Sequence, residues 1–504
     1  MSLISVQNLT FAYGGGEPVF DNVSFQIDTD WRLGFVGRNG RGKTTFLRIL
    51  AGELEYSGKI SASVSFDYFS YNADSFARCF KSPEKSYTAQ SPVLGATRRV
   101  LAGIAPEAEK WEIESEISRI GLDEEVMSRD FATLSGGERV KAMLAAMFCR
   151  RGGFPLIDEP TNHLDMNGRA AAASYLRGKK GFILVSHDRE FLDGCVTHIL
   201  AVNKAGVEVS RGNFSTWRED KERRDNFEEG RNRRLEKDIK RLDEAKKRAA
   251  GYSGAAEASK IGQGPCDRGF VGHKAAKLMN RAKNAERRRE REIDEKEGLL
   301  KNIEYSPDLK ITQEEYPARV LVSLRGVAVN YGGADVCSGV SFEIERGDRI
   351  SLQGGNGSGK SSVIRLVCGY AAASAGEARL GGGLKISYVG QETSDLNGDL
   401  DEYARGFGID ISLFKTILRK LDFARAQFDK RLEDLSEGQK KKVGLARSLC
   451  ERAHLHVWDE PLNYVDVLSR IQIERMIIEY KPTMIFAEHD KMFCEKAGNK
   501  VVKL

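Results

Sequence analysis

The sequence predicts an α/β protein that consists of two similar domains joined by a long α-helical hairpin. Three observations lead to this prediction. The chain has 504 residues, which is too many for one hydrophobic core. The same ordered series of motifs occurs twice, and the segment between the two series is highly charged, with apolar residues at helical spacing. We therefore expect a first domain at 1–216, a linker at 217–315 and a second domain at 316–504.

The composition is that of an ordinary cytoplasmic protein, with 41% hydrophobic and 30% charged residues. No stretch approaches the roughly 18 apolar residues that a membrane helix needs, and the start, MSLISVQNLTF, does not resemble a signal peptide. The eight cysteines form no CxxC pair, which argues against a zinc site and a disulfide scaffold. We expect a cytoplasmic chain without a membrane partner. Because the net charge is only +5, a nucleic-acid partner requires a local basic patch.

Each repeat begins with a glycine-rich loop that fits the pattern GxxxxGK[ST]. The loops read GRNGRGKT at 37–44 and GGNGSGKS at 354–361, and each follows a short apolar strand and precedes a helical pattern. Backbone amides and the helix N-terminus of such a loop bind phosphate groups, and its lysine neutralises their charge. The predicted nucleotide-binding residues are Gly37, Asn39, Gly40, Gly42, Lys43, Thr44 and Thr45, and Gly354, Asn356, Gly357, Gly359, Lys360, Ser361 and Ser362.

Two further motifs follow each loop in the same order. The first series has LSGGE at 134–138 and FPLIDEPTNHLD at 154–165; the second has LSEGQ at 435–439 and LHVWDEPLNYVD at 455–466. This series resembles the ATP-binding-cassette (ABC) class, whose signature reads LSGGQ. The resemblance implies two ABC-type P-loop nucleotide-binding domains, here called the first and second cassette, with ATP and Mg²⁺ as ligands.

The aspartate and glutamate of each DEP motif are the central candidates for chemistry. Asp158 and Asp459 end apolar strands, where an open parallel sheet binds ligands, and we expect them to hold magnesium with the hydroxyls of Thr44 and Ser361. The adjacent carboxylates are expected to orient or deprotonate the attacking water. The resemblance makes the two histidines of VSHD and AEHD sensors of the γ-phosphate, whereas His456 is interpreted as structural. The predicted catalytic residues are Glu159, Glu460, His187 and His489.

In the ABC class, the signature of one cassette contacts the ATP that the opposite cassette binds. The resemblance therefore implies that Ser436 and Gly438 complete the first site, and that Ser135 and Gly137 complete the second. Tyr13 and Tyr331 resemble the aromatic residue that stacks on adenine, although an ordinary turn tyrosine is the alternative interpretation.

The two repeats differ at positions that bear on activity. Gln391 matches the glutamine that senses magnesium in the ABC class, but the aligned position of the first repeat is Tyr71, and Glu437 replaces the glycine that the first signature has at Gly136. We therefore expect two competent but unequal sites. The spacing from loop to signature also places 16 extra residues in the first repeat, and we expect a short arm insertion near 72–130.

The linker contains a basic segment beside its predicted tip. Gly and small residues favour a mobile tip near 251–273, between two helices. Residues 268–289 contain eight basic residues and one acidic residue, so we favour contact with nucleic acid over a solvated helix face, with Phe270 and His273 available for stacking. The predicted RNA-binding residues are Arg268, Lys274, Lys277, Arg281, Lys283, Arg287, Arg288 and Arg289.

Two cassettes joined by a charged helical hairpin resemble the ABC-F proteins, and this resemblance covers essentially the whole chain. The strings NLTFAYGGG, DRGFVGHKAAKLMNRAK and LSEGQKKKV resemble the antibiotic-resistance branch associated with lincosamides, pleuromutilins and streptogramin A. In that branch the ATP-bound form enters the ribosome, and the linker pushes the P-site tRNA while its tip acts near the peptidyl-transferase centre to release the drug. Hydrolysis then permits departure. The resemblance implies ribosomal RNA and P-site tRNA as partners of a monomer whose two cassettes pair with each other.

Three alternatives stay open at this point. A general translation factor of the same family would have the same motifs without a role in resistance. The ATPase subunit of a transporter could also contain two fused cassettes, but it has no obvious use for a basic hairpin. A repair or chromosome-maintenance ATPase would need zinc-binding cysteines or far longer coiled coils, neither of which the sequence contains.

Overall fold

The computed structural model describes residues 2–14, 16, 18–70, 97–203, 206–258, 308–331, 334–393 and 396–504. The predicted RNA-binding residues at 268–289 and Tyr71 lie outside the described residues, as does most of the predicted tip. Two compact units make up the chain. One consists of Met1–Trp217 and Ser306–Leu504, which contain the first and second cassette, and the other is Arg218–Tyr305.

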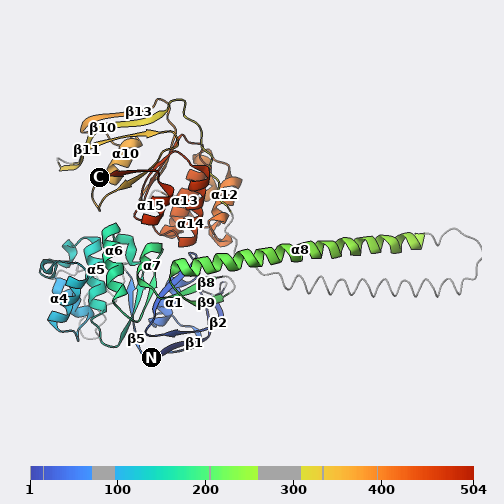
Figure 1. The fold of residues 1–504 in the computed structure, drawn as a ribbon, viewed down its shortest axis with the longest axis horizontal. Helices are drawn as coiled ribbons and strands as arrows, with labels where there is room; N and C mark the ends of the chain where they lie inside the picture. The colour runs from blue at the N-terminus through green and yellow to red at the C-terminus, as the bar shows by residue number, and fades with distance from the viewer. Residues whose placement is uncertain are drawn as a thin grey trace, which may run out of the picture. The chain divides into compact units, whose positions relative to one another are not determined.

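The first cassette contains a six-stranded sheet and a smaller antiparallel sheet (Figure 1). The strand order of the large sheet is β5-β6-β7-β3-β8-β9, and all its neighbours are parallel except β8 and β9. The small sheet has the order β2-β1-β4. The strands are β1 Leu3–Ala12, β2 Pro18–Asp28, β3 Arg32–Gly37, β4 Ser57–Ser61, β5 Ser65–Ser70, β6 Gly153–Asp158, β7 Phe182–Val185, β8 His198–Asn203 and β9 Gly206–Arg211. The helices are α1 Lys43–Leu50, α3 Thr97–Ile104, α4 Lys110–Arg119, α5 Gly136–Met147, α6 Met166–Arg177 and α7 Arg189–Cys195.

The second cassette repeats this plan with a parallel sheet of order β14-β15-β16-β12-β17 and an antiparallel sheet of order β11-β10-β13. Its strands are β10 Val320–Tyr331, β11 Ala334–Glu345, β12 Arg349–Gln353, β13 Ala375–Leu380, β14 Ile386–Val389, β15 Leu455–Asp459, β16 Met484–Ala487 and β17 Lys500–Lys503. Its helices are α10 Lys360–Val367, α11 Leu400–Gly406, α12 Ile411–Lys420, α13 Glu437–Cys450, α14 Val467–Tyr480 and α15 Lys491–Ala497.

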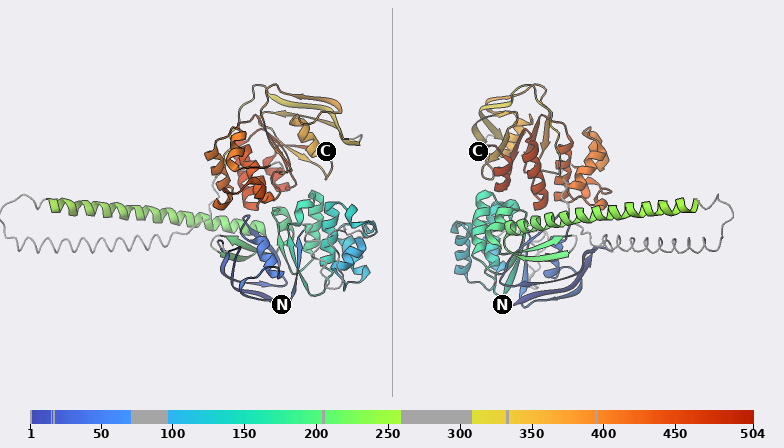
Figure 2. Two further views of the ribbon diagram at one scale, coloured as in Figure 1. Left: turned by 180° about the vertical axis from the view of Figure 1, so that it is seen from behind. Right: turned by 45° about the vertical axis from the view of Figure 1, so that its right-hand side comes forward.

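Helices cover both faces of each parallel sheet, as the views in Figures 1 and 2 show. The strand β7 demonstrates why, since all four of its residues are apolar and buried. Phe182 and Leu184 belong to one core cluster with α5 and α6, whereas Ile183 and Val185 belong to another with α1 and the small sheet. Side chains of a strand alternate between faces, so a strand covered on both faces is continuously apolar.

The predicted site residues meet at one edge of each sheet because the sheets are parallel. The strands β3 and β12 end at the glycine-rich loops, β6 and β15 end at Asp158 and Asp459, and β7 and β16 precede the predicted histidines. Carboxyl ends of parallel strands lie at the same edge, which is where α/β proteins bind ligands.

The two cassettes pack against each other within one compact unit. Val467 and Ile471 of α14 belong to the apolar core cluster of the first cassette. Near them, the Arg189 guanidinium lies 2.6 Å from the Glu474 carboxylate, and both side chains are almost completely buried. The contact between cassettes is therefore partly apolar and partly ionic.

The helix α8 spans Phe214–Ala258 and contains the described residues of the second unit, Arg218–Tyr305. Phe214 and Trp217 at its start are buried in the first cassette. The helix continues through Ala258, so the first eight residues of the segment expected to form the tip are helical instead. Five of the ten residues from Ala249 to Ala258 are alanine, and their high helix propensity outweighs the two glycines among them.

Candidate functional site: two paired phosphate loops

Glycines are required at the end of each phosphate loop. Gly42 directly precedes α1 with φ +85°, and a Cβ atom there would lie 2.4 Å from Val19 Cγ1. Gly359 precedes α10 with φ +92°, and a Cβ atom would lie 3.0 Å from Cys337 Cβ. Only glycine adopts this left-handed conformation at such close packing. The turn therefore presents the backbone amides of a helix N-terminus, which bind anions.

The loop lysines are buried and directed into their own loops. Lys43 Nζ donates to the carbonyl oxygens of Gly37 at 2.8 Å and Arg38 at 3.1 Å. Lys360 Nζ donates to those of Gly354 and Gly355, both at 2.9 Å. Burial lowers the pKa of both lysines, and the carboxylates around them oppose this effect. Each loop thus surrounds one ammonium group.

Each strand-end aspartate lies beside the hydroxyl that follows the loop lysine. Thr44 Oγ1 and Tyr68 Oη donate to Asp158 Oδ2 at 2.9 and 3.1 Å. Ser361 makes the matching hydrogen bond to Asp459. In both aspartates Oδ1 is buried and accepts no hydrogen bond from the described residues. Burial raises the pKa of each aspartate, which means that its ionised form is unfavourable in free energy unless a cation lies beside it. A hydroxyl beside an unsatisfied carboxylate oxygen fits the oxygen ligands of Mg²⁺.

The predicted catalytic glutamates have strained backbones. Glu159 has φ +50° and Glu460 has φ +47°, and both lie in the left-handed region. Their amides donate to the carbonyl oxygens of Val185 and Ala487, at the ends of neighbouring strands. Such conformations in residues other than glycine cost about 1 kcal/mol or more and cluster at functional sites. The strain places both carboxylates at the same edge as the phosphate loops.

A histidine contacts each glutamate, but the polar surroundings of the two glutamates differ. His187 Nε2 lies 3.2 Å from Glu159 Oε1, and His489 Nε2 lies 3.4 Å from Glu460 Oε1. Glu460 Oε2 also accepts hydrogen bonds from Gln391 Nε2 at 3.0 Å and Asn463 Nδ2 at 2.6 Å. Neither Glu159 oxygen accepts a side-chain hydrogen bond from the described residues.

These surroundings shift the two glutamate pKa values in opposite directions. Burial, reinforced by the Asp158 charge and opposed by Lys43, raises the pKa of Glu159 to about 8. Burial also acts on Glu460, but hydrogen bonds from His489 and Asn463 and the nearby charges outweigh it, so its pKa lies below the ordinary value. Burial lowers the pKa of His187 well below its ordinary value. The two sites are therefore electrostatically unequal.

The signature serines begin the helices α5 and α13. Ser135 Oγ accepts a hydrogen bond from the Glu138 amide, and Ser436 Oγ accepts one from the Gln439 amide. The Glu138 and Gln439 side chains bond back to the serine amides, which completes a capping box in each case. This explains why a glutamate or glutamine closes each signature. Each serine thus lies at a helix N-terminus, where anions are favoured.

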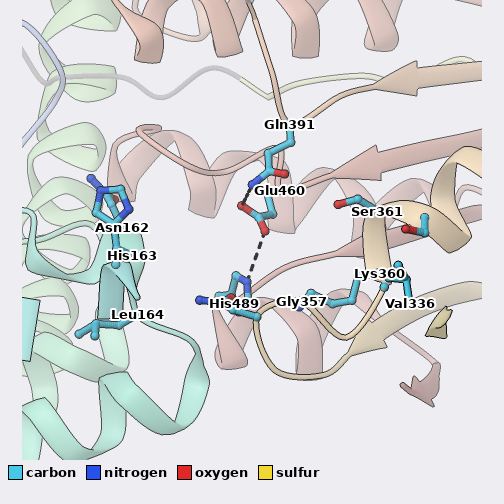
Figure 3. A pocket seen from close by; sticks show the side chains of 14 residues that line it. Asn162, His163, Leu164, Val336, Gly357, Lys360, Ser361, Gln391, Glu460 and His489 are labelled. Atoms are coloured by element: carbon cyan, nitrogen blue, oxygen red, sulfur yellow. Dashed lines mark hydrogen bonds and ion pairs between the residues drawn. The ribbon is translucent and has the colours of Figure 1, made fainter. Parts of the chain in front are cut away.

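One cavity brings residues of both cassettes together (Figure 3). Its volume is about 420 Å³. Lys360, Glu460 and His489 of the second cassette line it, and the first cassette contributes Gly136 of its signature, between the predicted Ser135 and Gly137. The other lining residues are Asn162, His163, Leu164, Val336, Asn356, Gly357, Gly359, Ser361, Ser362 and Gln391. The second phosphate loop thus faces the first signature.

The first phosphate loop lies against the second signature in a matching way. Asn39 Nδ2 donates to the Tyr464 carbonyl oxygen at 2.7 Å. A Cβ atom on Gly438 would lie 3.1 Å from Asn39 Nδ2 and 2.6 Å from that same carbonyl oxygen. Glycine at this signature position is therefore needed for the close approach of the two cassettes.

Of the two tyrosines predicted to stack on adenine, Tyr13 lies beside its phosphate loop, and Tyr331 ends a strand. Tyr13 is 51% exposed, and its hydroxyl hydrogen-bonds with Thr45 Oγ1 at 2.9 Å, which places it beside the first loop. Its ring meets Phe11 edge to face at 4.8 Å between centroids. Tyr331 is the last residue of β10.

Sequence reasoning missed several residues of the two sites. Asn463 bonds the catalytic glutamate, and its counterpart Asn162 lines the cavity. Both belong to a DEPxN pattern that occurs in each repeat, so the repeat itself could have identified them. Tyr68 and Lys441 carried no such signal, because their contacts depend on the packing of distant segments.

Comparisons with known proteins agree with this architecture. The ABC transporter family model matches residues 20–162 and 337–463, just over half of the chain. The ribosome protection protein VmlR of Bacillus subtilis is 26% identical over 495 residues, which cover 96% of this chain and 83% of that protein. ABC transporter F family member 5 of Arabidopsis thaliana is 25% identical over 544 residues, which cover 99% of this chain and 75% of that protein.

A solved structure supports the fold. The archaeal ribosome recycling factor aABCE1, in complex with the archaeal ribosomal stalk protein aP1, has a TM-score of 0.61 at 22% identity, with 98% of this chain and 87% of that chain covered. Within the described residues, no helix is long and apolar enough to cross a membrane. The chain belongs to the ABC transporter family and is an ATPase with two ATP-binding cassettes on one polypeptide.

Proposed function

We propose that this chain is a cytoplasmic, monomeric ABC-F ATPase that binds the ribosome and acts on the P-site tRNA through its linker. The observation that carries the proposal is the cavity shared by the second phosphate loop and the first signature. Both halves of that cavity come from one polypeptide, so closure around ATP requires no second chain. We infer that closure around ATP changes the distance between the two ends of the linker.

In the proposed mechanism each site takes its residues from both cassettes. Lys43, Asp158, Glu159 and His187 act with Ser436 and Gly438, while Lys360, Asp459, Glu460 and His489 act with Ser135 and Gly137. The lysine and the loop amides bind the outer phosphates. The glutamate accepts the proton of the water that attacks the γ-phosphate, and the histidine beside it senses that phosphate. The signature serine and glycine contact the γ-phosphate from the opposite cassette.

The residues at both sites fit a magnesium ion. Thr44 with Asp158, and Ser361 with Asp459, would hold it, and the buried Oδ1 of each aspartate has no hydrogen bond from the described residues. When bound, Mg²⁺ neutralises charge on the phosphates. Gln391, which the sequence predicts to sense this ion, donates a hydrogen bond to Glu460.

The ribosome is proposed as the partner on two grounds. VmlR is named a ribosome protection protein, and its match with this chain extends through the linker. The linker sequence at 268–289 also contains eight basic residues and one acidic residue, a charge imbalance that favours a phosphate backbone. We infer contact with ribosomal RNA and tRNA there, and antibiotic protection as the outcome.

Ribosome sedimentation with the Glu159→Gln, Glu460→Gln protein tests the proposal. Because both sites bind ATP without hydrolysing it, we expect this protein to co-sediment with ribosomes in ATP but not in ADP. Lys43→Ala, Lys360→Ala protein is the matched control and is expected to stay in the supernatant with either nucleotide. Fractionation of the Glu→Gln protein with membranes instead would favour a transporter subunit and contradict the proposal.

Growth of cells in the presence of antibiotics distinguishes a resistance role from a general translation role. Cells that express the wild-type chain are expected to tolerate lincosamides, pleuromutilins or streptogramin A at concentrations that stop cells expressing the Glu→Gln pair. Equal drug susceptibility of the two kinds of cells would contradict the antibiotic role but not the proposed binding to the ribosome.

A further inference from the structure

The second signature contains a side chain where the first has none. Glu437 is the first residue of α13 and lies between Ser436 and Gly438, and the matching residue of the first cassette is Gly136. The motif needs only its serine and glycines for close contact with a phosphate. The glutamate therefore requires another explanation, which its contacts supply.

The Glu437 carboxylate bonds a segment that also contacts the second ATP site. Thr393 Oγ1 donates to Glu437 Oε2 at 2.5 Å, and Thr393 is only 9% exposed. Two residues earlier, Gln391 Nε2 donates to Glu460 Oε2 at 3.0 Å. The segment 391–393 thus contacts the catalytic glutamate at one end and the signature at the other.

A second contact joins α13 to the residue directly before this segment. Lys441 is 2% exposed, and its Nζ donates to the carbonyl oxygens of Gly390 at 2.9 Å and Glu460 at 3.2 Å. The matching residue of the first cassette is Val140, which has no donor. Neither Val140 nor Gly136 can make these bonds with its side chain, so this tie is particular to the second cassette.

The tied signature faces the first ATP site. Gly438 lies against Asn39 of the first phosphate loop, close enough that a Cβ atom would come within 3.1 Å of Asn39 Nδ2. Ser436 lies two residues before Gly438 and is the cap of the same helix. Because Glu437 lies between Ser436 and Gly438, a displacement at Glu437 moves both of these signature residues.

We propose that Glu437 is a positioning residue for the first ATP site. The hydroxyl of Thr393 holds its carboxylate, and this bond sets the position of Ser436 according to the position of Gln391 in the second site. The proposal rests on the composite sites described under the proposed function. Under this proposal, the state of the second site affects the first site through the hydrogen bond between Thr393 and Glu437.

Single-turnover hydrolysis of pre-bound ATP in the full chain tests this proposal. In the Glu460→Gln background, where only the first site hydrolyses, Glu437→Gly and Thr393→Val are each expected to lower the rate constant about fivefold, the effect of one partly exposed hydrogen bond to a charged group. The two changes together should lower it little further, because both remove the Thr393–Glu437 bond. Glu437→Gly also removes the Lys440–Glu437 ion pair, but this pair is 3.5 Å long and partly exposed and is expected to contribute little. Glu437→Gln keeps an acceptor for the Thr393 hydroxyl and is expected to restore at least half of the rate.

The Glu159→Gln background, where only the second site hydrolyses, separates positioning from a general structural role. Glu437→Gly is expected to change the rate there by less than twofold. Glu433→Gln is the matched control in both backgrounds, since Glu433 bonds Arg431 and the Gly398 amide, outside the 391–393 segment. Equal losses in the two backgrounds, additive losses for the pair, or a Glu437→Gln protein as slow as Glu437→Gly would overturn the proposal.

One further variant tests the composite sites themselves. Ser436→Ala in the Glu460→Gln background is expected to slow the first site more than Glu437→Gly does. If Ser436→Ala has no effect there, the proposed pairing of the first phosphate loop with the second signature is wrong. If Ser436→Ala acts and Glu437→Gly does not, only the positioning role is wrong.

Discussion

At the scale of single residues, the two cassettes use the same catalytic set in different surroundings. Glu460 accepts hydrogen bonds from Gln391 and Asn463, which favour its ionised form, whereas burial raises the pKa of Glu159 to about 8. Both glutamates occupy the same strained position after a buried strand. Their pKa values differ because burial and the Asp158 charge dominate at Glu159, whereas hydrogen bonds and nearby positive charges outweigh burial at Glu460.

The Gln391 bond gives a prediction for the second site. In the Glu159→Gln background, Gln391→Ala is expected to lower the single-turnover rate about tenfold, because Glu460 loses a donor that holds its carboxylate. Gln391→Glu should be slower still, since it places a second carboxylate beside Glu460. Acid-quench assays should give single-turnover rates that decrease in the order glutamine, alanine, glutamate at position 391. A Gln391→Glu protein faster than the Gln391→Ala protein would contradict this role.

At the scale of elements, β15 contains a buried histidine that affects stability. His456 is fully buried, its Nδ1 lies 3.3 Å from Ser448 Oγ, and burial lowers its pKa to about 4. The unfolded chain binds this proton below about pH 6.5 and the folded chain does not until about pH 4. The free energy of unfolding should therefore fall as the pH is lowered through this window.

We expect the second cassette to lose about 2 kcal/mol from this histidine between pH 7 and pH 5. Urea unfolding followed by tryptophan fluorescence measures the loss, with Trp458 as the reporter in the second cassette. His456→Asn cannot take up the proton, so its unfolding should depend less on pH in this range. The same pH dependence in both proteins would show that His456 does not contribute.

Short elements with one dominant signal could be predicted from the sequence. The strands before both loops, the helices after them and the strands that end at Asp158 and Asp459 lie where periodicity and motif context put them. The end of α8 could not be placed, because alanine propensity and glycine content conflict at 249–258. The contacts of Thr393 and Lys441 were also beyond prediction, since they join segments about 40 to 50 residues apart that only the packed fold brings together.

At the scale of the whole molecule, the contact between cassettes is asymmetric. Arg189 is buried against Glu474 at 2.6 Å and Asp490 at 3.6 Å. At the matching position of the second cassette, Lys491 meets Glu190 at 3.0 Å, and both side chains are about half exposed. One side of the interface thus contains a desolvated ion pair, while the matching pair on the other side is solvated.

Removal of the buried partner should weaken the interface. Glu474→Ala removes the nearest ion-pair partner of the buried Arg189 charge and leaves the charges of Asp490 and Asp188 near it. We expect a loss of about 3 kcal/mol in unfolding free energy. Glu190→Ala is the matched control and is expected to have no measurable effect, because exposed pairs contribute little. Equal unfolding midpoints for the two variants in denaturant would show that the buried pair does not stabilise the contact.

The pairing of each phosphate loop with the opposite signature is the central claim, and single-turnover hydrolysis tests it most directly. With only the second site able to hydrolyse, in Glu159→Gln protein, Ser135→Ala should slow the reaction at least tenfold, while Ser436→Ala should change it less than twofold. In Glu460→Gln protein the two effects should exchange places. If each site instead depends on the signature of its own cassette, the composite arrangement of the two ATP sites is contradicted.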